Sequence, residues 1–340
     1  MPHQYHLFGL TIASDLELPE LLPAPSGAPV DAHVLLEPFS KQIDESIRLT
    51  HSAFFHPNIQ FGHGVFQMDV DGVARYRVEG GSRILVSPSV GVADIDLRAY
   101  LLGTAVGVLL HQRRLLPLHV CAVAIDGQVH AFCGQSGAGK STLAAAFHLH
   151  GYPMLSDDVG VVVPKPDGQV LFYPGFPRIK LWRDALNHFD IDEKPLVRDV
   201  SRADKFHLAL HGSFGIEPMP LRRLYVLERG EACSSPKVDP VSKPQAVGLL
   251  IEHTYRTELV RDVGDAKNHL QQCVRVAQTI DCFKFERSWD LNLVEETLDF
   301  IVREPLPNPG STRLDSRLTT GQVKSPRIPE PFRSSGWGTV

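Results

Sequence analysis

The sequence has few cysteines and no cysteine motif. Five cysteines are scattered over 340 residues, and none of them forms a Cys-x-x-Cys pair or the spacing of a zinc site. An odd number of widely separated cysteines does not form the framework of a small disulfide-bonded domain. The sequence therefore predicts reduced thiols, with Cys121 and Cys133 as small core residues.

A long hydrophobic segment is also missing. The most apolar run, residues 99–110, is about a dozen residues long and is followed by His111-Gln112-Arg113-Arg114. A helix needs roughly 20 apolar residues to cross a bilayer, so this run predicts a core helix. The first residues lack the charged and then apolar pattern of a secretory signal. We therefore expect a cytoplasmic protein with no membrane partner.

No charge of either sign dominates the chain. The formal net charge is −5, from 34 lysines and arginines and 39 acidic residues. Proteins that bind nucleic acid or anionic membranes through charge carry a basic excess, which this chain lacks. We expect no nucleic-acid partner.

One glycine-rich segment carries the clearest chemical signal. It lies between an apolar run at 129–133, which predicts a strand, and an alanine-rich run at 143–147, which predicts a helix. Strand, loop and helix together match G-x-x-x-x-G-K-[ST] in the context that this phosphate-binding motif requires. Its residues are Gly134, Gln135, Ser136, Gly137, Ala138, Gly139, Lys140, Ser141 and Thr142.

This motif predicts that the chain binds ATP with Mg²⁺. Glycines allow the backbone N–H groups of the loop to point at phosphate oxygens, and the helix N-terminus adds partial positive charge. Lys140 is expected to reach the β- and γ-phosphates, and the Ser141 hydroxyl to bind magnesium.

A pair of aspartates follows about one helix later. A short strand ending at Leu155 leads into Ser156-Asp157-Asp158, which a crossover connection should place beside the glycine loop. One carboxylate can hold magnesium and the other can accept the proton of an attacking hydroxyl. We assign Asp157 as the base and Asp158 to the metal, although the residue types alone leave the reverse assignment open.

Three further basic residues are candidates for the site. His119 begins a predicted strand, 119–125, that turns at Asp126-Gly127 into the strand before the glycine loop, so it can pair with an aspartate. Arg178 and Lys180 follow a Pro-Gly-x-Pro segment and can face the phosphates; ordinary surface bases are an equal alternative.

The rest of the chain predicts an α/β fold with a β-rich N-terminal lobe. Residues 1–93 form that lobe, with a hairpin around Asp71-Gly72 and a surface segment at 16–21. Residues 94–303 form the phosphate-loop domain, with helices at 94–114, 243–252, 265–278 and 291–303. Residues 183–215 show no clear period and predict a loop. Residues 304–340 have the composition of a disordered tail.

These motifs resemble the C-terminal domain of the HPr kinase/phosphorylase family. The resemblance rests on the hairpin 119–127, the glycine loop and Leu155-Ser156-Asp157-Asp158. Smaller HPr-kinase-like proteins, including those of lasso-peptide biosynthesis, have segments similar to 101–103 followed by 111–113, and to 174–178 with 181–182. The resemblance implies a nucleotide-binding core shared with phosphoenolpyruvate carboxykinases. It also implies that His119, the loop residues 134–142 and Asp157 with Asp158 form the catalytic machinery.

The family implies ATP-dependent phosphorylation of a serine on a peptide or small protein. Family members with phosphorylase activity carry a Glu-x-Arg-Gly signature where this chain has Phe172-Tyr173-Pro174-Gly175, so we do not predict that activity. In this interpretation Arg178 steadies the transferred group. Two alternatives stay open: a small-molecule kinase or carboxykinase-like enzyme, and an ATP-sensing module without turnover. The oligomeric state, a homo-oligomer included, is also left open.

Overall fold

The computed structural model describes residues 2–39, 48–50, 58–62, 64–199, 202–210, 214–230 and 235–303, and it has a mixed α/β architecture. The predicted tail at 304–340 and Cys233 lie outside these residues. The other four cysteines are buried free thiols, as expected of reduced side chains. None of the described helices is long and apolar enough to cross a membrane.

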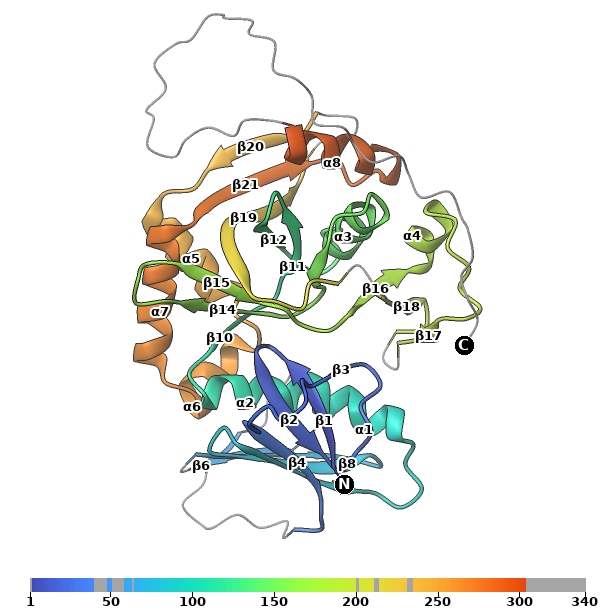
Figure 1. Cartoon of the computed structure of the whole chain (residues 1–340), viewed down its shortest axis with the longest axis vertical. Coiled ribbons are helices and arrows are strands. Elements are labelled where there is room, and N and C mark those ends of the chain that lie inside the picture. Colours follow the sequence, from blue (N-terminus) through green and yellow to red (C-terminus); the bar gives the residue numbers. More distant parts are fainter. Residues whose placement is uncertain are drawn as a thin grey trace, which may run out of the picture.

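The N-terminal part of the chain forms one sheet, seen at the bottom of Figure 1. Its strands are β1 His3–Leu7, β2 Leu10–Ser14, β3 Leu22–Pro23, β4 Ala32–Leu36, β5 Arg48–Thr50, β6 Asn58–Gly62, β7 Val65–Val70, β8 Ala74–Glu79 and β9 Arg83–Pro88. Among the described residues their spatial order is β3-β1-β2-β4-β9-β8-β7-β6-β5. The hairpin predicted around Asp71-Gly72 is confirmed, since β7 and β8 pair there from Val70 opposite Ala74.

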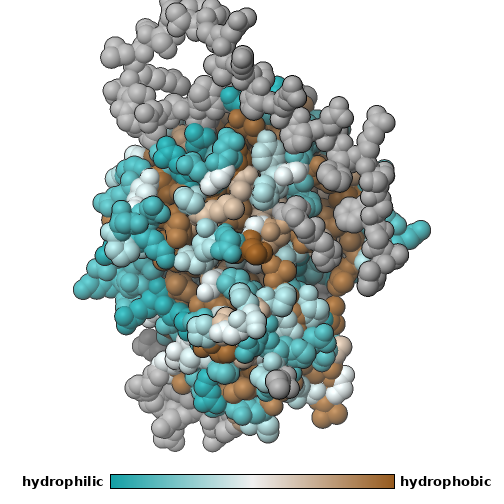
Figure 2. Space-filling view, viewed as in Figure 1, coloured by the Kyte–Doolittle hydropathy of each residue, from teal (hydrophilic) through white to brown (hydrophobic). Residues whose placement is uncertain are grey.

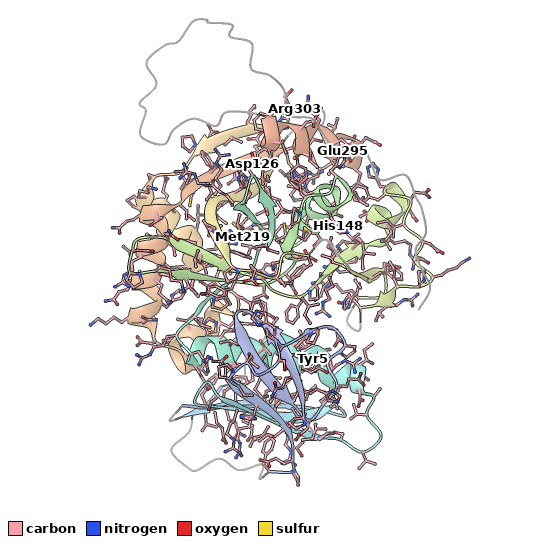
Figure 3. All side chains as sticks on the ribbon, in the orientation of Figure 1. Tyr5, Asp126, His148, Met219, Glu295 and Arg303 are labelled. Atoms are coloured by element: carbon pink, nitrogen blue, oxygen red, sulfur yellow. The ribbon has the colours of Figure 1, made fainter. Side chains whose placement is uncertain are left out.

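The prediction that 16–21 is a surface segment holds for Glu17 and Pro19, which are exposed, but is wrong for its leucines. Leu16, Leu18 and Leu21 are buried, because this short segment alternates apolar and exposed residues and turns its leucines into the core under the first sheet. The backbone N–H of Leu18 donates to the hydroxyl of Tyr5, which Figure 3 labels in this part of the molecule.

The predicted helix at 94–114 is present as three consecutive segments, α1 Asp94–Tyr100, the π-helical η1 Leu101–Ala105 and α2 Val106–Gln112. Its buried residues, including Leu97 and Leu109, belong to the same apolar core as the N-terminal sheet. Figure 1 shows it lying between that sheet and the rest of the protein. The domain boundary at 93/94 stays a prediction.

A second, mixed sheet forms the centre of the remaining chain. Its strands are β10 Leu116–Leu118, β11 Cys121–Ile125, β12 Gln128–Cys133, β13 Met154–Ser156, β14 Gly160–Pro164, β15 Val170–Tyr173, β19 Met219–Arg229, β20 Lys237–Pro240 and β21 Asp281–Arg287. Within the described ranges the order is β10-β14-β15-β19-β12-β11-β13, and β21 pairs with both β19 and β20. The predicted hairpin before the glycine loop is confirmed, because β11 and β12 pair antiparallel around Asp126-Gly127.

Helices cover both faces of this sheet. Its helices are α3 Lys140–Leu149, α5 Lys243–Glu252, η2 Thr257–Leu259, α6 Val260–Val263, α7 Ala266–Thr279, η3 Leu291–Leu293 and α8 Val294–Arg303. One face packs against α3 and α8, and the other against α5 and α7. Figure 3 marks α3 and α8 by His148 and Glu295. In Figure 2 hydrophilic residues gather on the left, over α5 and α7. The helices predicted at 243–252, 265–278 and 291–303 are confirmed.

The prediction of a loop at 183–215 is wrong for nearly half of its described residues. They contain α4 Arg183–His188, β17 Val197–Arg198 and β18 Lys205–Ala209, and β18 pairs with β16 Arg178–Trp182 in a small sheet of order β16-β18-β17. Phe206 and Leu208 of β18 are buried against Ile179 and Leu181 of β16. A short alternating strand with a distant partner gives too weak a local signal to stand out.

Candidate active site

The glycine loop joins β12 to α3 through backbone conformations that favour glycine. Gly134, Gly137 and Gly139 have φ values of 143°, 87° and 77°, which side-chain-bearing residues rarely adopt. Gly139 is the N-cap of α3, so the loop opens directly at a helix N-terminus. The free N–H groups and partial positive charge found there favour an anionic ligand.

Arg287, the last residue of β21, holds the glycine loop in place through hydrogen bonds. Its guanidinium donates to the carbonyl oxygens of Ala138 at 3.2 Å and Gly139 at 3.3 Å, and also to Ser288. Arg287 is buried, and burial lowers its pKa to about 10, so it remains charged at neutral pH. A Cβ atom at Gly139 would collide with this guanidinium. The arginine therefore helps to fix which way the peptide groups of the loop point.

Lys140 folds back over the loop that precedes it. Its Nζ donates to the carbonyl oxygens of Gly134 at 2.8 Å and Gln135 at 3.2 Å, and the residue is only 9% exposed. These are neutral acceptors, so the ammonium keeps its full positive charge at the centre of the loop. That charge is available to phosphate oxygens placed in the loop.

Asp157 is joined to the first turn of α3. The Ser141 hydroxyl donates to its Oδ1 at 2.7 Å, and the backbone N–H of Lys180 donates to its Oδ2 at 2.6 Å. Asp157 is 3% exposed. Burial raises its pKa above the usual range, although the hydrogen bond from Lys180 opposes the shift. The carboxylate is thus held close to the glycine loop and is more basic than an exposed aspartate.

Asp158 contacts two basic side chains. Lys180 Nζ lies 3.0 Å from Oδ2, and His119 Nδ1 lies 3.3 Å from Oδ1. Burial alone would raise the pKa of Asp158, but these two groups outweigh it and hold the pKa at about 2. Its φ of 98° is unusual for a residue with a side chain, and such strain is often found at functional sites.

His119 lies two residues before β11, although the sequence predicted that it begins the strand. Its backbone N–H donates to the carbonyl oxygen of His253 at 2.8 Å, and its ring stacks on Tyr255 with centroids 6.2 Å apart. Burial lowers the pKa of His119 to about 4 despite the opposing charge of Asp158, so the imidazole is neutral at pH 7. It therefore orients Asp158 without neutralising it.

These groups face one cavity of about 560 Å³. Its walls include the loop and α3 residues Ser136, Gly137 and 139–142, both aspartates, His119 and Lys180. An aromatic and apolar wall is supplied by Trp182, Trp289, Leu291 and Val294. The cavity thus combines a phosphate-sized cradle, two carboxylates and an apolar wall, as small-molecule sites commonly do.

The candidate basic residues Lys180 and Arg178 do not both lie in the first cavity. Lys180 lines the cavity, whereas Arg178 lines a second cavity of about 690 Å³ beside Asp158. The first cavity also contains two residues that the sequence analysis missed, Arg287 and Trp289. A signal for Arg287 exists, because Phe283, Phe285 and Arg287 alternate with polar residues as on one face of a strand.

The oxygen groups at the loop fit a magnesium ion bound together with phosphate. Mg²⁺ favours one or two carboxylates plus phosphate oxygens and water. The Ser141 hydroxyl and the two aspartates supply hard oxygen ligands of this kind. In the described part of the chain, no group of three or more His, Cys, Asp or Glu side chains forms a metal site independent of phosphate.

No protein-family model and no curated protein sequence matches the chain. Among solved structures it is similar to the Hpr(Ser) kinase/phosphatase from Coxiella burnetii, with 14% sequence identity and a TM-score of 0.30. The match covers 55% of this chain and 95% of that chain.

Proposed function

We propose that this protein is an ATP-dependent kinase that transfers the γ-phosphoryl group to a hydroxyl, a serine on a peptide or small protein, from an HPr-kinase-like phosphate-loop core. One contact is the main support for the proposal. The Ser141 hydroxyl, directly after the glycine loop, donates a 2.7 Å hydrogen bond to Asp157 of the carboxylate pair. A loop that binds phosphate needs no such carboxylates for binding alone. Phosphoryl transfer needs them both for magnesium and for the proton of the acceptor.

The loop amides and Lys140 bind the triphosphate, with Arg287 holding the loop in shape. The neighbouring wall of Trp289, Leu291 and Val294 is the surface for the adenine base, since a planar base packs on aromatic and aliphatic side chains. Lys140 already points at the loop centre through its contacts with Gly134 and Gln135, so little reorganisation is needed when phosphate replaces these acceptors.

Ser141 and Asp158 would hold the magnesium ion. When bound, magnesium neutralises charge on the phosphates. Asp158 suits this role because Lys180 and His119 keep its pKa low, so it is ionised at any physiological pH.

Asp157 accepts the proton of the acceptor hydroxyl. A general base works best when its pKa lies near the working pH. Burial raises the pKa of Asp157 toward that pH, whereas the pKa of Asp158 is lowered away from it. Lys180 contacts both aspartates, one through its backbone and one through its ammonium, and so fixes their relative position.

The direct test is incubation of the purified protein with Mg²⁺ and γ-labelled ATP in the presence of serine-containing peptides. Label on peptide serine that disappears with Asp157→Asn supports the proposal. Label on small hydroxyl compounds alone would favour a small-molecule kinase. ATP binding without transfer to any acceptor would favour a nucleotide sensor and overturn the kinase assignment.

A further inference from the structure

The catalytic groups lie at the junction of two cavities. The first contains the glycine loop. The second, of about 690 Å³, lies between the N-terminal sheet with its helix and the central core. Five residues line both cavities: His119, Asp158, Lys180, Asp199 and Arg202. The second cavity therefore meets the first at Asp158, whereas Asp157 lines only the first.

In phosphoryl transfer the nucleotide and the acceptor lie on opposite sides of the transferred phosphorus. The attacking and leaving oxygens are roughly in line through phosphorus, so the acceptor approaches from the side opposite the nucleotide. If ATP occupies the glycine loop, that side is the second cavity. We propose that this cavity is the acceptor site and that an extended polypeptide segment occupies it; the inference rests on the kinase function proposed above.

One wall of the second cavity comes from the N-terminal part of the chain. It is lined by Glu20, Met68 and several residues of α1 and η1, namely Ile95, 98–100 and 102–104. Figure 1 shows α1 below the small sheet β16–β18, which supplies part of the opposite wall. The lining residues Leu102, Gly103 and Thr104 belong to the π-helical η1, a rare helical form that frequently marks functional sites. The N-terminal sheet and its helix would thus take part in choosing the acceptor.

The walls of the second cavity carry charged and apolar side chains together. Here both signs of charge occur around the cavity, with Arg98, Arg178 and Arg256 on one hand and Glu20, Glu252 and Glu258 on the other. The buried Nε atom of Arg178 has no hydrogen-bond partner among the described residues. Such mixed walls match a ligand with several different side chains.

Two exposed apolar side chains stand on opposite walls of the same cavity. Ile95 of α1 is 37% exposed and Val197 of β17 is 51% exposed. Among the described residues β17 is the outer strand of the small sheet, so its backbone can pair with an added strand. Val197 and Ile95 would contact apolar side chains of that segment, while its serine passes Asp158 at the junction and reaches Asp157 in the first cavity.

The test uses the full-length protein, Mg²⁺ and γ-labelled ATP with a degenerate peptide library that has a fixed central serine and blocked ends. The variants are Ile95→Asp, Val197→Asp and their combination. Leu270→Asp is the matched control, since Leu270 is 48% exposed on α7 and lines neither cavity. Binding of the fluorescent nucleotide mant-ATP and thermal melting are measured for every variant.

Each cavity substitution should raise the KM for the library about tenfold, the loss expected for one apolar contact. The affinity for mant-ATP and the melting temperature should stay at the wild-type values, and Leu270→Asp should behave as wild type. An unchanged KM in the double variant, or an equal loss in Leu270→Asp, overturns the location of the acceptor site. Label that enters only free serine, glycerol or a sugar overturns the polypeptide assignment.

Failure of the underlying kinase assignment gives a different result. In that case wild-type protein either does not bind mant-ATP or binds it and labels neither peptides nor small hydroxyl compounds. Loss of library labelling in the cavity variants, with mant-ATP binding retained, can arise only if the kinase assignment holds.

Discussion

The hydroxyl of Ser141 lies 2.7 Å from Oδ1 of Asp157 and donates a hydrogen bond to it. This contact joins the first turn of α3 to the residue that follows β13. The same carboxylate accepts a hydrogen bond from the backbone N–H of Lys180, which belongs to β16 of the small sheet. Helix, central sheet and small sheet therefore converge on one buried oxygen pair, and the position of Asp157 depends on all three.

Replacement of Lys140 with methionine should weaken ATP binding by about 10- to 100-fold. Methionine retains the buried aliphatic stem but removes the ammonium, and hydrogen bonds to charged groups contribute roughly 1.5–3 kcal/mol each. Titration with mant-ATP measures the effect. Lys267→Met, an exposed substitution near the start of α7, is the control and should bind as wild type. Equal affinity in Lys140→Met and wild type would show that the loop does not hold phosphate.

Asparagine at position 157 should lower kcat about 10²- to 10⁴-fold with little change in ATP affinity. The amide retains the size of the carboxylate and can still contact Ser141, but it cannot accept a proton, and this range is typical for loss of a general base. The measurement is the rate of label transfer to peptide at saturating Mg²⁺. A folded Asp157→Asn variant with near-normal kcat contradicts the base assignment.

Asparagine at position 158 should instead raise the Mg²⁺ concentration needed for half-maximal rate. It removes an ionised oxygen ligand and leaves Lys180 and His119 without their carboxylate partner. Magnesium titrations of both variants distinguish the two roles. If Asp157→Asn shifts the magnesium requirement and Asp158→Asn abolishes transfer at saturating Mg²⁺, the roles are reversed.

Short-range patterns account for the parts of the structure that the sequence could predict. The β11–β12 hairpin follows from Asp126-Gly127 between two apolar runs, and α5 follows from a helical segment preceded by Ser242 with Gln245 in a capping box. The proximity of Asp157 to the loop follows from the one-helix connection between them. Each of these signals lies within about 20 residues of the feature that it predicts.

Long-range pairing accounts for what the sequence could not predict. The pairing of β16 with β18 brings Lys180 to both aspartates, yet no local pattern in 178–182 identifies β18 as its partner. Arg287 lies about 150 residues from the loop carbonyls that it binds. Register and partner choice depend on packing across the whole sheet, so these contacts become visible only in the folded chain.

Glutamine in place of Arg287 should weaken mant-ATP binding by about tenfold. Glutamine is shorter and neutral, so the carbonyl groups of Ala138 and Gly139 lose a charged donor, a contribution of roughly 1.5 kcal/mol. Arg287→Lys retains the charge and should restore part of the affinity, which a purely structural loss at this site would not predict. Arg222→Gln is the control, since this half-exposed arginine pairs with Asp281 at the other end of β21. Equal affinities in all four proteins would contradict the positioning role of Arg287.

The protein should lose stability as the pH falls from 7 to 5, and His130 should carry part of that loss. Burial lowers the pKa of His130 to about 4, and the charges of Arg223 and Arg222 add to the shift. The unfolded chain, with a histidine pKa near 6.5, takes up the proton that the folded chain excludes. The resulting stabilisation is complete above pH 6.5 and is lost as the pH falls toward 4.

For His130 this loss is about 2 kcal/mol between pH 7 and pH 5. His130→Phe removes the titrating group and retains the ring beside Tyr225. Between pH 7 and pH 5 the free energy of unfolding of this variant should therefore fall by about 2 kcal/mol less than that of the wild type. Urea unfolding at pH 8, 7, 6 and 5 measures both proteins. Between pH 8 and 7 the difference between them should stay nearly constant, because little protonation occurs there in either state. Parallel curves from pH 7 to 5 would show that the folded protein admits a proton at His130 as readily as the unfolded chain does.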